Sequence, residues 1–141
     1  MTKDIEKLIP HRSPFLFVDE IISADEKGSV SEHVFTENEF FFKGHFPEYP
    51  VVPGVILVET MAQAGGAALS SQNIFEKNAL FFLATVDKVK FRSQVRPGDK
   101  VRMEVTNLRV SPRMIKQAGK AYVGDTLAAE AEWMCLVGSA Q

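Results

Sequence analysis

The sequence has one cysteine, one tryptophan and two tyrosines in 141 residues, and it lacks long hydrophobic runs. A single cysteine excludes a disulfide within the chain and is typical of a reducing compartment. No apolar stretch approaches the roughly 20 residues that a membrane-spanning helix needs. Asp4 and Glu6 stand where a secretory signal would begin its apolar segment. We therefore expect a cytoplasmic protein that does not enter a membrane.

An excess of basic charge is also missing. The 16 Lys and Arg residues are outnumbered by 18 Asp and Glu residues, for a net charge of -2. This charge argues against a general affinity for nucleic acid. The chain is 45% hydrophobic and contains 11 phenylalanines, which is typical of one globular domain, here 1–141, with a substantial core. Cys135 alternates with Trp133 and Val137, so we expect it in that core rather than as a reactive thiol.

The apolar pattern predicts one long helix, from Pro53 to about Ser70. Proline is favourable in a first helical turn. The apolar residues at 55–58 point in all directions around the helix, which is typical of a helix buried on most sides. A shorter helix is expected over 3–9. It should end before Pro10, because the residue that precedes a proline avoids the helical conformation.

Strands are expected on both sides of the long helix. Before it, apolar segments at 15–22 and 29–36 flank a polar loop that ends at Gly28. After it, period-two patterns predict strands over 80–92, 101–106, 116–123 and 126–137, with turns at 97–99 and 124–125. Two strands, one buried helix and four antiparallel strands predict an α+β fold in which a sheet surrounds a single helix.

Glu59 interrupts the apolar sequence of the predicted long helix. Burying a charged carboxylate is costly, so such a group is usually neutral or paired. Gln63 follows four residues later on the same face and is placed to hold the carboxyl group. Ala62 and Gly66 leave space beside it, in which a protonated carboxyl can act as a general acid. A structural glutamate that pairs with a basic core residue fits the same pattern.

His45 and Gly54 add two groups that suit the same chemistry. His45 belongs to a proline-rich loop, and Gly54 stands at the start of the helix, where its N–H has no intrahelical acceptor and the helix dipole favours negative charge. A neutral histidine, an exposed amide and an acid favour proton abstraction next to a carbonyl, with loss of water. A loop histidine and a turn glycine without catalytic roles are the alternatives.

Metal and nucleotide chemistry are not indicated. His11, His33 and His45 lack the spacing of metal ligands. Gly65-Gly66 lacks the strand–glycine–helix context of a nucleotide loop. We therefore expect neither a metal nor a cofactor.

Three parts of the chain resemble the β-hydroxyacyl-acyl carrier protein dehydratases, and together they extend over nearly its whole length. They are Ile9-Pro10-His11-Arg12-x-Pro14-Phe15-Leu16-x-Val18-Asp19, then His45-Phe46-Pro47-x-x-Pro50-Val51-x-Pro53-Gly54-Val55 with Glu59 and Ala62-Gln63, and finally Phe91-Arg92 with Val95-x-Pro97-Gly98-Asp99. Glutamate at position 59 separates the chain from the related dehydratase–isomerase branch, which is similar but carries aspartate there.

The resemblance implies a hotdog fold in homodimers that assemble into hexamers as trimers of dimers. It implies loss of water from (3R)-hydroxyacyl thioesters on acyl carrier protein, giving the trans-2-enoyl product of fatty acid elongation without metal or cofactor. His45 would act on the C2 proton and Glu59, from the opposite subunit, on the hydroxyl group. The Gly54 amide would polarise the thioester carbonyl.

The resemblance also suggests which residues contact the acyl chain and its carrier. Phe82, Phe46 and Pro53 would line the acyl tunnel, and Phe82 stands where several family members have tyrosine. The acidic carrier protein needs basic contacts. Four basic residues in one segment are candidates for them, although a solvated strand face is the alternative: Lys88, Lys90, Arg92 and Arg96.

Two other functions remain open for a chain of this fold. One is a thioesterase or hydratase acting on coenzyme A thioesters, and the other is an acyl-binding module without activity. The pair of His45 and Glu59 favours dehydration, because thioester hydrolysis needs an activated water and no leaving hydroxyl. The presence of both residues argues against an inactive module.

Overall fold

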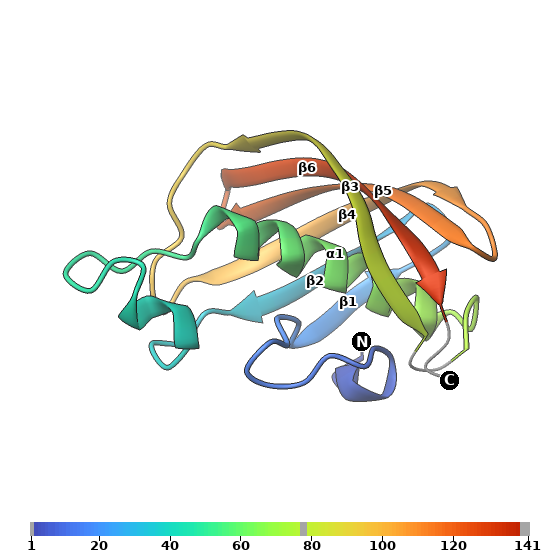
Figure 1. Ribbon diagram of the computed structural model, residues 1–141, viewed down its shortest axis with the longest axis horizontal. Helices are drawn as coiled ribbons and strands as arrows, with labels where there is room; N and C mark the ends of the chain where they lie inside the picture. Colours follow the sequence, from blue (N-terminus) through green and yellow to red (C-terminus); the bar gives the residue numbers. More distant parts are fainter. Residues whose placement is uncertain (1, 77–78, 139–141) are drawn as a thin grey trace.

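The computed structural model of the protein describes residues 2–76 and 79–138. The elements in chain order are η1 (Ile5–Lys7), β1 (Glu20–Ala24), β2 (Gly28–Val34), η2 (Phe40–Lys43), α1 (Gly54–Ser71), β3 (Leu80–Phe91), β4 (Lys100–Val110), β5 (Met114–Val123) and β6 (Thr126–Gly138). The strands form one six-stranded antiparallel sheet in the order β1-β2-β4-β5-β6-β3. Figure 1 shows this sheet curving around α1, which lies along its inner face. This arrangement confirms the predicted α+β hotdog fold.

The helix α1 is the centre of the core, as its sequence predicts. It begins directly after Pro53 and buries 14 of its 18 residues. Small residues allow the helix and the sheet to approach each other closely. A Cβ atom at Gly65 would collide with the Gln117 side chain of β5, and one at Gly119 would lie 2.5 Å from the Trp133 ring. No helix in the described part of the chain is long and apolar enough to cross a membrane.

The later strands agree with the predicted alternation. Along β6, Ala129, Ala131, Trp133 and Cys135 are buried, and β5 pairs with β6 through the turn at Gly124, where φ is +59°. Gly98, in the turn before β4, also has a positive φ of +91°. Both turns therefore use the left-handed conformation that glycine adopts without strain.

The N-terminal segment differs from the expectation in two ways. The predicted helix over 3–9 is a single 3-10 turn, and the strand expected at 15–22 begins only at Glu20. Residues 15–18 are not part of a strand, and two of their backbone groups bond instead to a helix side chain. The N–H of Phe17 donates to Gln63 Oε1 at 2.8 Å, and the carbonyl of Phe15 accepts from Gln63 Nε2 at 3.0 Å.

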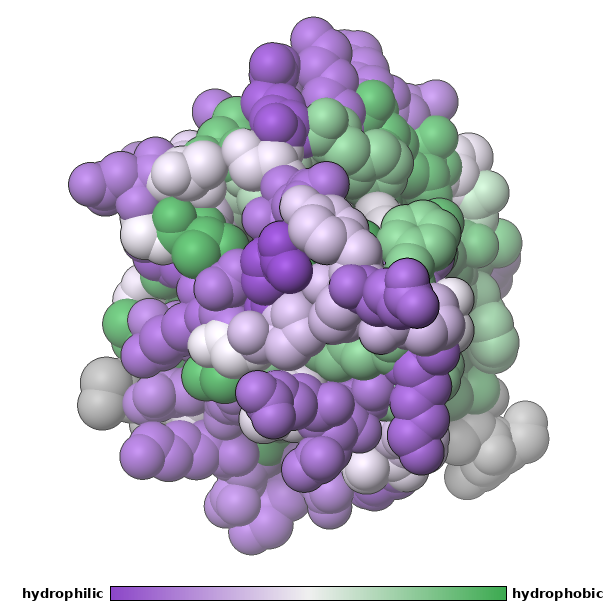
Figure 2. Space-filling model, turned by 90° about the vertical axis from the view of Figure 1, so that its left-hand side faces the viewer, coloured by the Kyte–Doolittle hydropathy of each residue, from purple (hydrophilic) through white to green (hydrophobic). Residues whose placement is uncertain are grey.

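The edge strand β3 is more exposed than its apolar sequence suggests. It forms one end of the sheet and pairs with β6 only. Phe82 is 56% exposed and Phe91 is 55% exposed, and Leu83 and Val86 are also exposed. Figure 2, which views the left-hand end of Figure 1, shows apolar surface gathered on its right-hand side, where α1 and β3 lie. One chain therefore leaves a large apolar strip of its sheet uncovered.

Candidate active site

Glu59 lies in the middle turns of α1 with its carboxyl group partly shielded from solvent. Its side chain is 22% exposed, and Glu59 Oε2 accepts a hydrogen bond of 2.9 Å from Gln63 Nε2. The expected contact between Glu59 and Gln63 is therefore present. It forms because residues four apart in a helix lie one above the other on the same face.

The carboxyl group of Glu59 opens into a small apolar cavity between α1, β3 and the N-terminal segment. The cavity holds about 20 Å³, roughly the room that one water molecule needs. It is lined by Ile9, His11, Glu59, Ala62, Gln63, Gly66, Phe81, Leu83 and Cys135. The space expected beside Ala62 and Gly66 exists, although the ring of Phe81 narrows it at Gly66.

His11 is a neighbour of Glu59 that the sequence reasoning did not assign to the site. Its Nε2 lies 3.6 Å from Glu59 Oε2, while its Nδ1 is buried without a hydrogen-bond partner among the described residues. Burial lowers the pKa of His11, with the charge of Glu59 acting in the opposite direction and that of Arg12 adding to the decrease. The available signal was its place in the segment Ile9-Pro10-His11-Arg12, which the family resemblance includes.

Cys135 completes the inner wall of the cavity and is a core residue, as predicted. It is 2% exposed, and burial, together with the charge of Glu59, raises the pKa of its thiol to about 12. A thiol with so high a pKa stays protonated and is a poor nucleophile. Its contribution to the cavity is therefore its small apolar volume.

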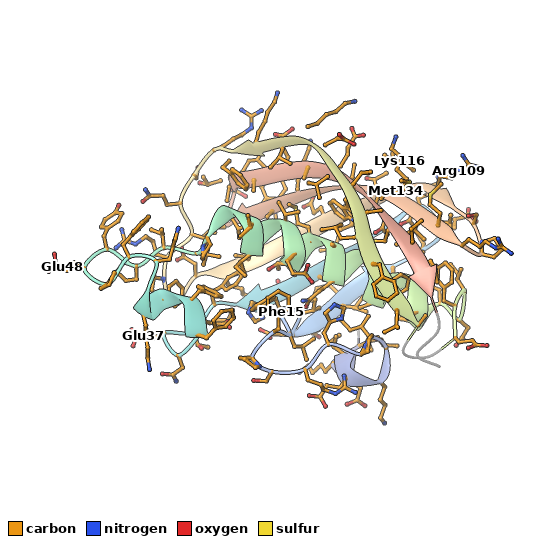
Figure 3. All side chains as sticks on the ribbon, in the orientation of Figure 1. Phe15, Glu37, Glu48, Arg109, Lys116 and Met134 are labelled. Carbon is orange, nitrogen blue, oxygen red and sulfur yellow. The ribbon has the colours of Figure 1, made fainter. Side chains whose placement is uncertain are left out.

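His45 lies in the loop before α1 and makes no contact with Glu59 within the described part of the chain. Its Nδ1 is 3.2 Å from the carbonyl oxygen of Val51, and its ring stacks on Phe46 at 4.2 Å. Figure 3 shows Glu48, three residues after His45, at the far left end of the molecule, whereas Phe15, which binds Gln63, lies below the middle of α1. Among the described residues, no hydrogen bond or ion pair joins the predicted acid to the predicted base.

Gly54 is the first residue of α1, and no hydrogen bond from its N–H is found among the described residues. The absence of a side chain matters here, because a Cβ atom would lie 2.7 Å from the ring of Phe91. The amide of Gly54 is therefore available to a ligand and lies beside an exposed aromatic ring of β3.

The predicted tunnel residues are not gathered around Glu59 in one chain. Phe46 and Phe82 are 53% and 56% exposed, and neither they nor Pro53 line the cavity at Glu59. In β3 the ring of Phe81 faces α1 at Gly66, while the ring of Phe82 lies beside Gly138. Phe82 therefore points away from the cavity that its own chain forms.

The predicted carrier-protein contacts lie at the edge strand and in the segment that follows it. Lys88 and Arg92 form ion pairs with Glu132 and Glu130, at 3.4 and 2.8 Å, and the hydrogen bond from Arg92, with the charges of Lys90 and Lys120 nearby, lowers the pKa of Glu130. Arg96 instead stacks over the ring of Tyr49, in the loop that carries His45. Of the four basic residues, Arg96 is the one in contact with that loop.

A sheet curled around one buried helix, with an acid held in the helix beside a small cavity, defines a hotdog-fold protein whose site faces α1. Solved structures agree with this fold. The dehydratase heterocomplex ApeI:P from Xenorhabdus doucetiae superposes with a TM-score of 0.82 at 14% identity, covering 96% of this chain and 91% of that one. A hypothetical thioesterase with coenzyme A from Streptococcus pneumoniae superposes with a TM-score of 0.62 at 9% identity, covering 85% of each chain.

Sequence comparison identifies the family. A family model described as the FabA-like domain matches residues 9–132. The chain is 47% identical over 135 residues to the 3-hydroxyacyl-(acyl-carrier-protein) dehydratase FabZ of Desulforamulus reducens, covering 95% of this chain and 94% of the relative. It is 44% identical over 137 residues to the protein of that description from Geobacillus thermodenitrificans, covering 96% and 94%. The chain belongs to the FabA-like family.

Proposed function

We propose that this chain is a dehydratase of fatty acid elongation, which removes water from 3-hydroxyacyl thioesters on acyl carrier protein to give the trans-2-enoyl product in the cytoplasm. The observation that carries this proposal is the 47% identity to a curated dehydratase over 95% of the chain. The fold alone does not separate dehydration from hydrolysis, because a hypothetical thioesterase shares it.

Within this reaction, His45 removes the C2 proton, Glu59 donates a proton to the leaving hydroxyl group, and the Gly54 amide stabilises the developing oxyanion of the thioester. The Gln63–Glu59 hydrogen bond supports the role of Glu59, because it fixes the orientation of the carboxyl group next to a cavity. The free first-turn amide supports the role of Gly54, because helix N-termini favour negative charge. No metal is needed for these steps.

The test is an assay with 3-hydroxyacyl-acyl carrier protein, in which enoyl formation and release of the free carrier thiol are followed together. We expect enoyl product without thiol release. Glu59→Gln and His45→Ala should each lower kcat by about 10²- to 10⁴-fold, the usual contribution of a general acid or base. A rate within about a factor of two of the wild type would refute the assigned roles, and thiol release without enoyl product would indicate a thioesterase.

The separation of His45 from Glu59 within one chain leads us to propose that two copies complete each site. The edge strand β3 is 12 residues long and carries exposed apolar side chains, which a soluble monomer usually avoids. Antiparallel pairing of two β3 strands in a symmetric dimer would cover this strip. It would also bring the exposed Phe82 of one copy toward the cavity of the other, where it can line an acyl tunnel with Phe46 and Pro53.

Mixing two inactive variants tests whether the site is shared. In a heterodimer of His45→Ala and Glu59→Gln, one of the two shared sites would contain both intact residues. A fully exchanged equimolar mixture should therefore regain about a quarter of the wild-type activity, because half of the dimers in a two-fold symmetric system are mixed. Mixtures that stay inactive after subunit exchange would place both residues of a site in one chain. Light scattering of the wild type would separate a dimer from the proposed trimer of dimers.

The basic residues Lys88, Lys90, Arg92 and Arg96 are our proposed contacts for the acidic carrier. Arg96 is the first to test, because it lies against the loop of His45. Arg96→Glu should raise KM for the carrier-bound substrate about ten-fold or more, with little change in kcat, and added salt should weaken the difference. Lys116→Glu is the matched control, since Lys116 lies at the opposite end of the molecule from Glu48 (Figure 3). Equal effects of both changes would argue against a local contact.

A further inference from the structure

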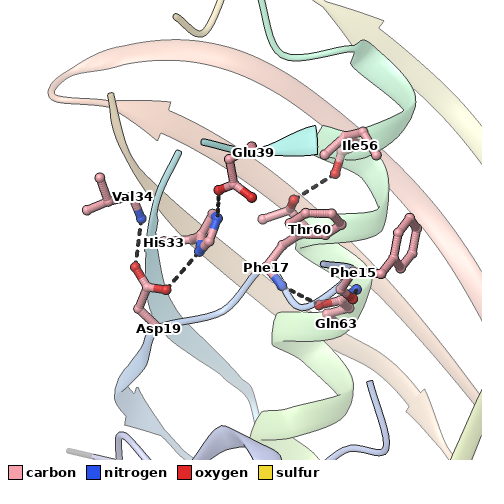
Figure 4. Close-up of polar contacts among 9 residues, drawn as sticks. All are labelled: Phe15, Phe17, Asp19, His33, Val34, Glu39, Ile56, Thr60 and Gln63. Atoms are coloured by element: carbon pink, nitrogen blue, oxygen red, sulfur yellow. Dashed lines mark hydrogen bonds and ion pairs between the residues drawn. The ribbon is translucent and has the colours of Figure 1, made fainter. Parts of the chain in front are cut away.

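His33 lies between two carboxylates, those of Asp19 and Glu39 (Figure 4). Its Nδ1 is 2.8 Å from Asp19 Oδ1, and its Nε2 is 2.8 Å from Glu39 Oε2. The residue is only 5% exposed. An ionised carboxylate can only accept hydrogen bonds, so both ring nitrogens of His33 must donate. The geometry is therefore that of an imidazolium ion clamped by two anions.

The surroundings of His33 favour its charged form despite burial. Burial by itself lowers the pKa of His33, but the hydrogen bonds to Asp19 and Glu39 and the charges of these groups outweigh it and raise the pKa to about 9. The rings of Phe17 and Phe35 pack against the imidazole at centroid distances of 5.9 and 4.5 Å. The imidazole and the Glu39 carboxylate are shielded from water, at 7% and 12% side-chain exposure, which strengthens that ion pair, whereas Asp19 is half exposed.

The two carboxylates come from different segments. Asp19 precedes β1, and its second oxygen accepts the N–H of Val34 at 2.8 Å. Glu39 is the residue directly before η2. From β4, Lys100 acts on Asp19 while it pairs with Glu32 at 2.9 Å. Among the described residues, Asp19 and Glu39 are the charged groups that act on His33 itself. The clamp therefore joins the β1–β2 hairpin to the start of η2.

A short series of backbone hydrogen bonds connects this clamp to His45. The carbonyl of Glu39 accepts the N–H of Phe42 at 3.2 Å, which closes the turn of η2. The carbonyl of Phe41 then accepts the N–H groups of Gly44 and His45, at 3.2 and 3.0 Å. The position of His45 thus depends on where η2 begins, and the His33–Glu39 ion pair fixes that point.

We propose that His33 is a positioning residue for the dehydration: as an imidazolium it fastens Glu39, and with it the η2 turn that carries His45, to the β1–β2 hairpin. This inference rests on the proposed role of His45. Loss of the positive charge removes the bridge between the half-exposed carboxylate of Asp19 and the shielded carboxylate of Glu39, so the start of η2 moves away from the hairpin. A base displaced by about 1 Å from its working position can lose as much as 10²-fold in rate.

The variants His33→Gln and Glu39→Gln test the clamp in complementary ways. A glutamine at position 33 can donate to only one carboxylate at a time, and it carries no charge. A glutamine at position 39 can still accept from the ring of His33, but it removes the anion that favours the imidazolium. We expect kcat to fall about 10- to 100-fold in His33→Gln, with KM within about three-fold of the wild type, because the Glu59 cavity is untouched. Glu39→Gln should give a smaller decrease in the same direction.

The dependence of this effect on pH separates positioning by charge from general destabilisation. The catalytic groups are the same in wild type and His33→Gln, so their titrations cancel in the ratio of the two kcat values. We expect the kcat of the wild type divided by that of His33→Gln to be constant from pH 6 to 8. Above about pH 9, where His33 loses its proton, this ratio should fall toward one. A ratio that stays the same up to pH 10, or one that is close to one throughout, would overturn the proposal.

A matched control removes a buried polar contact that has no link to η2. Gln117 is fully buried and accepts the indole N–H of Trp133 at 3.1 Å. Gln117→Met should lower the melting temperature, as His33→Gln does, yet leave kcat per folded molecule within about two-fold of the wild type.

Amide hydrogen exchange measures the clamp without any activity. Faster exchange at Phe42, Gly44 and His45 is expected in His33→Gln and not in Gln117→Met. Unchanged exchange at these amides would refute the clamp even in an active enzyme. Faster exchange in a chain without dehydratase activity would retain the clamp and reject the proposed function.

Discussion

Gln63 donates to Glu59 across one turn of α1, with 2.9 Å between Gln63 Nε2 and Glu59 Oε2. The same amide group is held at both ends by the backbone before β1: Nε2 also donates to the carbonyl of Phe15, and Oε1 accepts the N–H of Phe17 (Figure 4). These two backbone contacts determine which end of the amide faces the carboxyl group. Gln63 therefore presents a donor to Glu59, which orients one carboxyl oxygen.

Replacing Gln63 with leucine should damage both catalysis and stability. The carboxyl group of Glu59 loses its orienting donor, so kcat should fall about ten-fold or more. The buried N–H of Phe17 loses its hydrogen-bond acceptor, which lowers the free energy of unfolding by about 1–3 kcal/mol. Steady-state kinetics and urea unfolding measure the two effects. Thr60→Val is the control, because Thr60 is buried in the same helix and its hydroxyl donates to the Ile56 carbonyl; similar kcat losses in both variants would contradict the assignment.

The clamp around His33 predicts that stability decreases with rising pH over a defined range. Its pKa is about 9 in the folded chain, against 6.5 as the ordinary value. Between these values the folded chain binds more protons than the unfolded chain, so the stabilisation is complete below pH 6.5 and is lost as pH rises through about 9. The raised pKa corresponds to about 3 kcal/mol at 1.36 kcal/mol per pKa unit. Urea unfolding at pH 6, 7.5 and 9 should show this decrease in the wild type and a flatter profile in His33→Gln; parallel profiles would disprove it.

His11 predicts the opposite pH dependence on the acidic side. Burial lowers the pKa of His11 in the folded chain, so below pH 6.5 the unfolded chain binds this proton more readily. The stability that His11 contributes is therefore present above pH 6.5 and is lost as the pH falls. When the pH is lowered from 7 to 5, the free energy of unfolding should therefore decrease more in the wild type than in His11→Gln. NMR titration of His11 and His33 measures the two pKa values directly, with the pKa of His11 expected below that of His33; a His11 pKa above the ordinary value would contradict the prediction.

Local patterns predicted the helix and the contact that lies within it. The helix α1 follows from Pro53 and an apolar run that continues around the whole helix, and the Gln63–Glu59 contact follows from a spacing of four residues. The exposure of β3 did not follow, since the sequence pattern reports which residues are apolar and not which of them the rest of the chain covers. The pattern over 80–92 predicts a strand, but it does not predict that Val86 and Phe91 are exposed in one chain.

Contacts between segments that are distant in the sequence could also not be predicted from the sequence pattern. The residues 15–19 have the composition of a strand, but their backbone bonds to Gln63, which stands more than forty positions later. His11 reaches Glu59 by the same docking of the N-terminal segment on α1. Neither periodicity nor residue spacing reports such a contact. The clamp of Asp19, His33 and Glu39 was missed for the same reason, because each partner reads alone as an ordinary surface residue.

Gly54→Ala tests the first-turn amide separately from packing. A methyl group at this position would lie 2.7 Å from the Phe91 ring, so the ring must turn away. Because that ring is 55% exposed, we expect a loss of about 1 kcal/mol or less in unfolding free energy. The methyl group restricts approach to the amide, so kcat/KM should fall about 100-fold, as when an oxyanion-hole donor is removed. Adding Phe91→Leu should restore packing without restoring kcat/KM; full recovery of activity would mean that Gly54 acts only by packing.

Gly119→Ala should destabilise the fold strongly without touching the site. A Cβ atom there would lie 2.5 Å from the Trp133 ring and 3.2 Å from the sulfur of Met61. Both side chains are almost fully buried, so neither can move aside as Phe91 can, and overpacking of this kind costs about 1–3 kcal/mol. Gly44→Ala is the matched control, because nothing lies within 4 Å of its Cβ position and its φ is -110°. Urea unfolding should therefore show a large decrease for Gly119→Ala and a change within about 0.5 kcal/mol for Gly44→Ala. Equal stabilities would mean that the helix–sheet spacing at Met61 and Trp133 is looser than these distances.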